Sequence, residues 1–254
     1  MAQALLLPLL EAGVVSRSGV QAAVASAASA ERLSASHGIA VSTTPDQAWQ
    51  APVVLLAVKP QQLEGAAAAA QASGNHPTGL LISVLAGVTL KRLEAAFPGR
   101  QCVRAVPNTP ALVRSGLTGL AFGAGVSEAQ RVQVRELFAL VGEVHELPES
   151  QLDAFLALTS SGPAFVALVA EAMADGAVAS GLPRQLAQHL AHRTLAGTAA
   201  LLHEQELHPG ALKDMVSSPA GTTIAGVREL ERAGLRSGLI EAVVAAAERS
   251  RQLA

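Results

Sequence analysis

The stretch "VVLLAVKPQQLEGAAAAAQASGNHPTGLLISVL", residues 53–85, contains two continuous apolar runs on either side of an alanine-rich segment. The runs at 53–58 and 80–85 have the length of strands and no polar alternation, which is typical of strands buried on both faces. Alanine is the best helix former, so the segment 60–73 between them is predicted to be a helix. A strand, a helix and a second buried strand form a βαβ unit of a parallel sheet.

The same alternation continues on both sides of this unit. Further strands are predicted at 20–26, 101–106, 117–123 and 143–147, and further helices at 29–38, 89–97 and 127–142. Ser127 and Glu128 suit the start of the last of these helices. The sequence therefore predicts an α/β domain with a doubly wound, mainly parallel sheet.

The pattern changes near residue 149. The rest of the chain shows helical periodicity almost throughout, with breaks at Gly162-Pro163, Gly181-Leu182-Pro183 and His208-Pro209. We therefore predict two domains, an α/β domain over residues 1–148 and an all-helical domain over residues 149–254. The helix around 164–180 is apolar nearly all round, so it needs packing partners on every side, and a second copy of the chain is an economical source of them.

The composition excludes several classes of protein. The 254 residues include 18 basic and 20 acidic side chains, no basic block and only six aromatic residues, so nucleic acid is not an expected partner. Cys102 is the only cysteine, which excludes a disulfide framework within one chain and fits the reducing cytoplasm. Its apolar neighbours predict a small buried side chain in a strand.

The N-terminal segment "MAQALLLPLLEAG", residues 1–13, has some features of a secretory leader. It lacks a basic region, however, and Glu11 closes its apolar run early, so we do not expect secretion. No apolar stretch of the sequence reaches the length that a membrane helix needs, and no membrane association is predicted.

Polar or small residues follow three of the predicted strands, where an open parallel sheet binds its ligand. Lys59 leaves a buried strand just before Pro60, and Asn108 lies between two prolines after another strand. At a third strand end, the missing side chain of Gly87 would let a flat ring approach the backbone beside Ala86. The alternatives are a solvated loop lysine and a plain proline-rich turn.

The end of the strand at 20–26 bears on the choice of dinucleotide. A carboxylate there usually hydrogen-bonds the ribose of NAD, but this chain has Ser26 and Ser29 with Arg32 nearby. These residues leave room for a 2′-phosphate, which favours NADP over NAD.

Two other motifs are interpreted as structural. Gly123-Ala124-Gly125 lacks the third glycine of a dinucleotide fingerprint and precedes Glu128, so it predicts an ordinary turn between strand and helix. His189 and His192 have no accompanying glutamate in register on their helix, so we expect an exposed helix face and no metal site.

The stretch "SSPAGTTIAGVRELE", residues 217–231, is a turn that leads directly into a helix. The unpaired N–H groups and the dipole of a helix start can hold an anion without an arginine. Thr222 or Thr223 could cap the helix, which would leave the other hydroxyl free to meet a substrate. Ordinary capping and the binding of a small carboxylate both explain the stretch.

Four segments together resemble pyrroline-5-carboxylate reductase: "LAVKP", "AVPNTPALV", "SSGPAFVALVAEAMADGAV" and "HPGALKDMVSSPAGTTIAGVRELE". The resemblance extends in order from Met1 to the C-terminus, and the last motif is specific to that family. It implies a hydride transfer from NADPH or NADH to the cyclic C=N carbon of 1-pyrroline-5-carboxylate, which gives L-proline. It also implies a Rossmann-like fold and a homodimer or a larger ring of dimers.

The resemblance also implies roles for individual residues. Thr223 matches the catalytic threonine, whose hydroxyl would hydrogen-bond the ring nitrogen, and the backbone from Gly221 through Thr222 to Thr223 would hold the substrate carboxylate. Glu206 matches a carboxylate on the substrate side. The residues that match cofactor-binding strand ends are Ala57, Val58, Lys59, Pro60, Ala86, Gly87 and Asn108, with Ser26 at the ribose. A further cofactor contact of the family falls near Met215, where relatives can have a polar residue.

The chain departs from the family at its start. The family begins with a strand and a Gly-x-Gly-x-x phosphate loop, whereas this sequence opens at the following helix and contains no replacement loop. We expect the sheet to be interrupted between the strands at 20–26 and 53–58, and the natural polypeptide to begin upstream of Met1. For the 254-residue chain alone we expect weak cofactor binding. The alternatives are a truncated form that only oligomerises and a related imine or β-hydroxyacid reductase.

Overall fold

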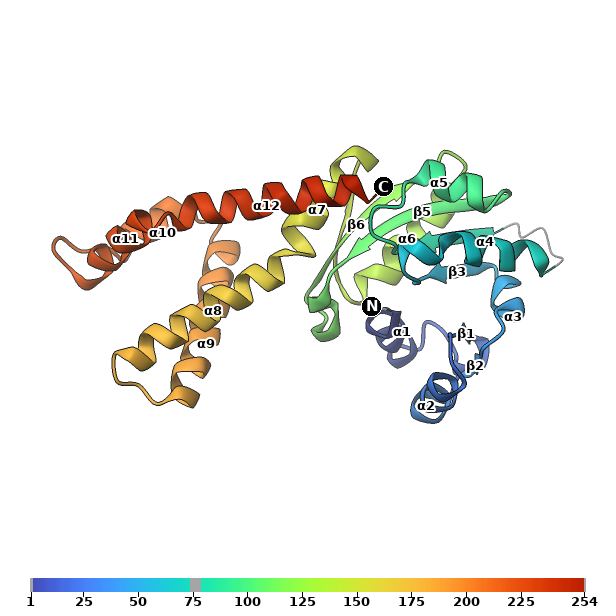
Figure 1. The fold of residues 1–254 in the computed structure, drawn as a ribbon, viewed down its shortest axis with the longest axis horizontal. Coiled ribbons are helices and arrows are strands. Elements are labelled where there is room, and N and C mark those ends of the chain that lie inside the picture. Colours follow the sequence, from blue (N-terminus) through green and yellow to red (C-terminus); the bar gives the residue numbers. More distant parts are fainter. Residues whose placement is uncertain (1, 74–78, 254) are drawn as a thin grey trace. The chain divides into compact units, whose positions relative to one another are not determined.

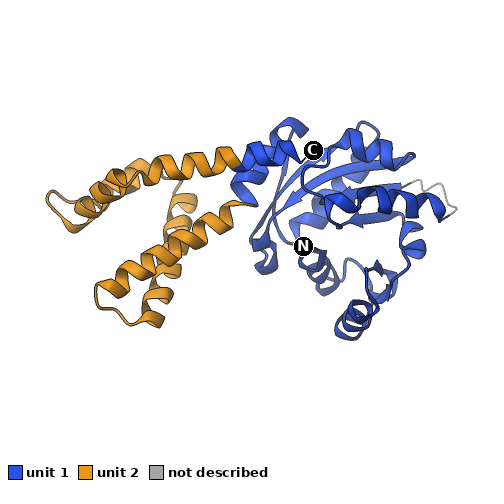
Figure 2. Cartoon of the chain, in the orientation of Figure 1, with its two compact units in different colours: residues 1–160, 246–254 blue, residues 161–245 orange. Residues whose placement is uncertain are grey.

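The computed structural model describes residues 2–73 and 79–253. The chain divides into two compact units (Figure 2). Residues 1–160 together with 246–254 form the first, here called the α/β unit, and residues 161–245 form the second, the helical unit.

The main sheet of the α/β unit has five strands in the order β3-β4-β5-β6-β7 (Figure 1). They are β3 (Val53–Leu56), β4 (Gly79–Ser83), β5 (Arg100–Pro107), β6 (Gly116–Phe122) and β7 (Gly142–Glu146). The strands β3, β4 and β5 are parallel, β6 is antiparallel to β5, and β7 is parallel to β6. The predicted mainly parallel sheet is therefore confirmed.

Helices pack on both faces of this sheet, because its strands are apolar on both sides. On one face, Leu80 and Ile82 of β4 contribute to a core with residues of α1 (Ala2–Glu11) and α6 (Glu128–Ala139). On the other face, Leu81 contributes to a core with α3 (Asp46–Trp49), α4 (Leu63–Ala72) and α5 (Leu90–Ala96). The helix α6 begins as predicted, because Ser127 caps it and exchanges hydrogen bonds with Gln130.

A separate two-stranded sheet, β1 (Gln21–Ala23) and β2 (Ala40–Ser42), precedes the main one, with α2 (Ala27–His37) between its strands. Among the described residues, no strand joins this small sheet to β3 by hydrogen bonds, which is the interruption expected from the sequence. At the resulting edge, three of the four residues of β3 are only partly buried. The short β2 was not predicted.

Cys102 lies in β5 and is 1% exposed, which confirms the prediction of a small buried side chain in a strand. Burial raises the pKa of its thiol to about 11, and the nearby carboxylate of Glu94 adds to the effect. The folded chain therefore binds this proton more tightly than the unfolded chain does. The resulting contribution to stability is fully present below pH 9, the ordinary thiol value, and is lost as the pH rises through about 11.

The variant Cys102→Ala is accordingly expected to lose less stability than the wild type between pH 9 and pH 11. Urea unfolding at pH 8, 10 and 11 measures the unfolding free energy of both proteins. Subtracting one value from the other at each pH removes the contribution of the other titrating groups. A difference in unfolding free energy that stays constant over this range contradicts the assigned burial of the thiol.

The segment after β7 is helical throughout, as predicted, and its helices end at the expected breaks. They are α7 (Leu152–Thr159), α8 (Gly162–Ala179), α9 (Arg184–Glu204), α10 (Pro209–Met215), α11 (Thr222–Arg232) and α12 (Leu235–Gln252). The sequence pattern changes at residue 148, but the α/β unit extends to Ser160 because Leu152 of α7 is buried against residues of β5 and β6. The C-terminal end of α12 also belongs to that unit.

The apolar length of α7 and α8 corrects one prediction. The helical stretch Glu149–Ala179 is long and apolar enough to cross a membrane by length and composition alone, whereas the prediction from the sequence is that no stretch has this length. The stretch is interrupted between Thr159 and Gly162, where α7 ends and α8 begins. Only 17% of its apolar window is buried within the chain. Its large apolar side chains that are exposed in the single chain include Leu158, Val166 and Leu168.

Candidate active site

The start of α11 in the helical unit has no side-chain cap. Gly221 occupies the N-cap position and has no side chain to offer, so neither Thr222 nor Thr223 caps the helix, contrary to the capping interpretation. Within the described residues, no hydrogen bond occupies either threonine hydroxyl. A Cβ atom at Gly221 would lie 2.3 Å from the Oγ of Ser218, so a larger residue would displace that hydroxyl.

The backbone amides at this helix start are available to a ligand. The N–H of Gly221 already donates to the carbonyl of Ser218 at 3.0 Å, which removes it from the amides expected to hold a carboxylate. The next amides, of Thr222, Thr223 and Ile224, belong to the first turn of α11 and have no carbonyl partner four residues earlier within the helix. These amides and the helix dipole favour a small anion beside the hydroxyl of Thr223.

Two strained backbone positions lie close in sequence to this helix start. Ala220 has φ +58° and Glu206, at the end of α9, has φ +49°, in the left-handed region that non-glycine residues rarely adopt. Such strain is commonly retained where it positions a functional group. Glu206 is exposed, and His208 begins α10 by accepting a hydrogen bond from the N–H of Gly210 at 3.1 Å.

The expected cofactor residues of the α/β unit fall into two groups. Ala57 to Pro60 follow β3, Ala86 and Gly87 follow β4, and the two strands are paired up to their last residues, Leu56 and Ser83. These segments therefore lie side by side at the carboxyl edge of the main sheet. Val58, Lys59 and Ala86 are exposed there. Ser26 caps α2 beside the small sheet, which is not hydrogen-bonded to the main one.

Gly87 is buried and has φ +74°, so its backbone requires glycine. The space where its side chain would lie is taken by the backbone and Cβ of Leu253, 2.9 Å from the position of a Cβ atom. The close approach that this glycine permits is therefore made, in this structure, by the C-terminal end of the chain.

Asn108 is buried at the end of β5, and both ends of its side-chain amide are paired. Its Oδ1 accepts from the N–H of Leu117 at 2.8 Å, and its Nδ2 donates to the carbonyl of Thr159 at 3.0 Å. The side chain thus joins the starts or ends of three elements, β5, β6 and α7. This geometry gives Asn108 a structural task in addition to the cofactor role expected from the sequence.

Replacing Asn108 by aspartate retains the acceptor but places a carboxylate against the carbonyl oxygen of Thr159. We expect the unfolding free energy to fall by about 2–3 kcal/mol, because a buried charge loses its donor and gains a repulsive neighbour. Thermal unfolding of Asn108→Asp checks this, with Gln61→Glu as a control for the same change at an exposed position. Equal melting temperatures for Asn108→Asp and the wild type contradict the pairing.

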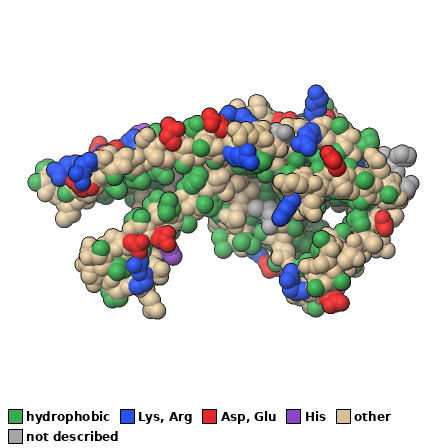
Figure 3. Space-filling view, in the orientation of Figure 1, with side chains coloured by type: hydrophobic (Ala, Val, Ile, Leu, Met, Phe, Trp, Pro, Cys, Tyr) green, Lys and Arg blue, Asp and Glu red, His purple; other side chains and the backbone are tan. Residues whose placement is uncertain are grey.

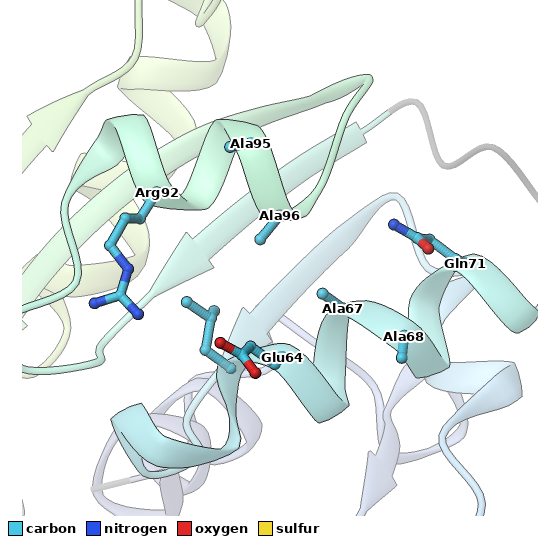
Figure 4. A pocket seen from close by; sticks show the side chains of 8 residues that line it. Glu64, Ala67, Ala68, Gln71, Arg92, Ala95 and Ala96 are labelled. Carbon is cyan, nitrogen blue, oxygen red and sulfur yellow. The ribbon is translucent and has the colours of Figure 1, made fainter.

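Other features of the chain do not join this site. A hollow between α4 and α5 is lined by alanines, with Glu64, Gln71 and Arg92 at its rim, and contains none of the expected site residues (Figure 4). His189 and His192 are exposed, and the described part of the chain has no cluster of side chains suited to a metal ion.

Sequence reasoning did not single out Arg104, a charged side chain in the middle of β5 that is 2% exposed. It forms ion pairs with Glu149 at 3.3 Å and Asp153 at 3.1 Å. A lone arginine inside the apolar run "QCVRAV" was a visible signal, because an arginine is almost never fully buried without a partner.

Two family descriptions match parts of the chain. Residues 149–253 match "Pyrroline-5-carboxylate reductase dimerisation", and residues 1–87 match "NADP oxidoreductase coenzyme F420-dependent". The first match covers almost the entire segment after β7, including the uncapped start of α11.

Curated and solved proteins are similar over most of the chain. A pyrroline-5-carboxylate reductase of Synechocystis is 50% identical over 201 residues, which cover 79% of this chain and 74% of that protein. The structure of a pyrroline-5-carboxylate reductase from Coxiella burnetii has a TM-score of 0.87 at 31% identity, covering 100% of this chain and 94% of that one. The Plasmodium falciparum enzyme, solved with NADP bound, has a TM-score of 0.89 at 25% identity, covering 99% and 93%.

Proposed function

Because this chain belongs to the pyrroline-5-carboxylate reductase family, we propose that it reduces the cyclic C=N bond of 1-pyrroline-5-carboxylate to L-proline, the last step of proline biosynthesis. The substrate is a small ring with one carboxylate and one imine nitrogen. A site for it must hold the carboxylate, place the C=N carbon against a hydride donor and stabilise the ring nitrogen.

The observation that carries the proposal is the uncapped start of α11. The amides of Thr222 and Thr223 offer the carboxylate two donors in a region of positive potential. A side-chain cap would occupy one of the first-turn amides, and the absence of a cap therefore leaves them available to an external anion. We assign the substrate carboxylate to this helix start.

The hydroxyl of Thr223 lies in the same turn as these amides and is half-buried. It is proposed to hydrogen-bond the ring nitrogen, so that the carboxylate and the nitrogen are fixed by one turn of helix. Glu206 is proposed to act on the substrate side as well, and its strained backbone supports a functional role.

The residues of the α/β unit fit one end of the proposed cofactor. NADPH, or NADH, supplies the hydride when it is bound. Val58, Lys59 and Ala86 are exposed at the carboxyl edge of the sheet, and Ser26 with Arg32 on α2 suits a 2′-phosphate. The chain has no Gly-x-Gly-x-x-Gly turn for the diphosphate. We assign the nicotinamide to Ala57–Pro60 and Ala86–Gly87, with Asn108 supporting that edge.

The helical unit is proposed to form a homodimer, which could assemble into a larger ring. Its internal core is small and consists mainly of Ala174, Ala187 and Ala191 between α8 and α9. Many of its larger apolar side chains are exposed in the single chain. Figure 3 shows hydrophobic side chains on the surface of this unit. The match to a dimerisation family supports a second copy as the partner. The cytoplasm is proposed as the compartment, because a single cysteine, Cys102, gives the chain no disulfide framework.

The proposal is tested by the oxidation of NADPH in the presence of 1-pyrroline-5-carboxylate, with 1-pyrroline as the matched substrate that lacks the carboxylate. We expect reduction of the first and a value of kcat/KM at least about 100-fold lower for the second, since a charged contact to the helix start is lost. Equal rates for both substrates would point to another imine reductase. No turnover by a folded oligomer would favour a form that only assembles.

A further inference from the structure

The end of α12 occupies the place beside Gly87 where the nicotinamide is expected, and both segments belong to the α/β unit. The carbonyl carbon and the Cβ of Leu253 lie 2.9 Å from the position that a Cβ atom of Gly87 would have. A flat ring stacked on this backbone would place its carbons about 3.5 Å from it. The atoms of Leu253 fill that space, so the ring and Leu253 cannot both lie on this side of Gly87.

The loop that carries Gly87, between β4 and α5, is fixed in place. Leu85 and Val88, on either side of Gly87, are 1% and 0% exposed, and both belong to the core on the α4 and α5 face of the sheet. The end of this loop is held as well, because the N–H of Leu90 donates to the carboxylate of Glu149 at 2.7 Å. Moving the loop would expose buried apolar side chains to water, so the end of α12 is the partner that can yield.

The end of α12 is held firmly only as far as Ser250. That residue is 3% exposed, and its hydroxyl donates to the carboxylate of Asp153 at 2.8 Å. The residues that follow, 251–253, are exposed, and we call them the α12 tail. Within the described part of the chain, no hydrogen bond joins the α12 tail to the loop of Gly87. Few contacts therefore have to break for the tail to turn away from the sheet edge.

We propose that the α12 tail is a latch over the nicotinamide edge of the main sheet, which opens when NADPH binds. This inference rests on the proposed function, because that function assigns the nicotinamide to the loop of Gly87. The latch is closed in the chain without cofactor, and Ser250 serves as its hinge. Binding of NADPH then includes the opening of the latch, which weakens the apparent affinity in proportion to the fraction of chains in which the latch is open.

The latch acts on one half of the cofactor. Ser26 and Arg32, which are proposed to hold the 2′-phosphate, belong to the start of α2 beside the small sheet, and that sheet is not hydrogen-bonded to the main one. Adenosine 2′,5′-bisphosphate contains this half of NADPH but has no nicotinamide. We therefore expect the α12 tail to oppose the binding of NADPH and to leave the binding of the bisphosphate unaffected.

The test compares the wild type with a chain that ends at Gln252, by fluorescence titration of NADPH and calorimetric titration of adenosine 2′,5′-bisphosphate. In the shortened chain, we expect the Kd for NADPH to fall about 5–10-fold and the Kd for the bisphosphate to change less than about twofold. The matched control is Leu253→Ala, which keeps the backbone and the Cβ that meet Gly87 and loses only the outer side chain. Its Kd for NADPH should stay within about twofold of the wild-type value.

Hydrogen exchange reports on the latch without a change of sequence. In the wild type, saturating NADPH should make the amides of residues 251–253 exchange at least about threefold faster, while those of residues 84–89 exchange more slowly. Saturating adenosine 2′,5′-bisphosphate should leave the exchange of both segments unchanged. Slower exchange of residues 251–253 in the presence of NADPH would make the tail a fixed wall of the site and overturns the latch.

The latch and the proposed function fail in different measurements. A shortened chain that binds NADPH no more tightly than the wild type, or that does not bind it, overturns the latch. A tightening that Leu253→Ala or the bisphosphate shows in full also overturns it, because that pattern indicates a general effect on the fold. If the chains bind NADPH but reduce no 1-pyrroline-5-carboxylate, the proposed reaction is wrong, and a lower Kd in the shortened chain still supports the latch.

Discussion

Replacing Thr223 by valine is expected to lower kcat about 100-fold and to leave the Kd for NADPH unchanged. Valine has nearly the same shape but no hydroxyl, so the proposed hydrogen bond to the ring nitrogen is lost. Removing one such preorganised donor from a site typically costs a factor of about 100 to 1,000 in rate. The backbone amides at the start of α11 remain, so the KM should change much less than kcat.

The matched control is Thr194→Val, because the Thr194 hydroxyl bonds only the carbonyl of Leu190 within α9. Steady-state rates at saturating NADPH and a fluorescence titration of NADPH give the two quantities. If Thr223→Val and Thr194→Val turn over alike, the assignment of Thr223 is wrong.

Leu168→Asp is expected to prevent the assembly of the chain and to abolish most of its activity. Leu168 lies in α8 and is 66% exposed in the single chain, in the segment that matches the dimerisation family. A carboxylate buried against an apolar partner has no counter-charge, and such a change in an interface typically costs several kcal/mol. We therefore expect the dissociation constant of the oligomer to rise by at least about 100-fold.

Analytical ultracentrifugation over a range of concentrations measures this change. The control is Val14→Asp, which introduces the same charge at a position 53% exposed in the α/β unit. A Leu168→Asp variant that remains assembled at low micromolar concentration contradicts the proposed dimer face.

Much of the α/β unit could be predicted from the sequence because its strands are buried on both faces and therefore appear as continuous apolar runs. The helix at 128–139 was equally clear, since Ser127 is a typical N-cap residue. Its side chain accepts a hydrogen bond from the backbone N–H of Gln130 at the helix start. The three residues of β2 were missed because a short, largely exposed strand has no distinctive pattern.

The site was harder to predict, because its decisive features are not residue types. Two threonines in a helix start suggest a cap, and only the backbone shows that Gly221 holds the N-cap position and leaves both hydroxyls unoccupied. Asn108 bonds Thr159, and Arg104 bonds Glu149 and Asp153, so each side chain has partners about 50 positions away in the chain. No local pattern reports such partners, although a buried arginine predicts that they exist.

The proposed function requires that the chain transfers the hydride of NADPH to the C=N carbon of 1-pyrroline-5-carboxylate. Incubation with 1-pyrroline-5-carboxylate and NADPH carrying deuterium at its transferable position, followed by NMR of the product, tests it most directly. We predict proline with one deuterium on the ring carbon that is bonded to nitrogen and carries no carboxylate. Proline without deuterium, or no proline from a folded and assembled chain, would contradict the account.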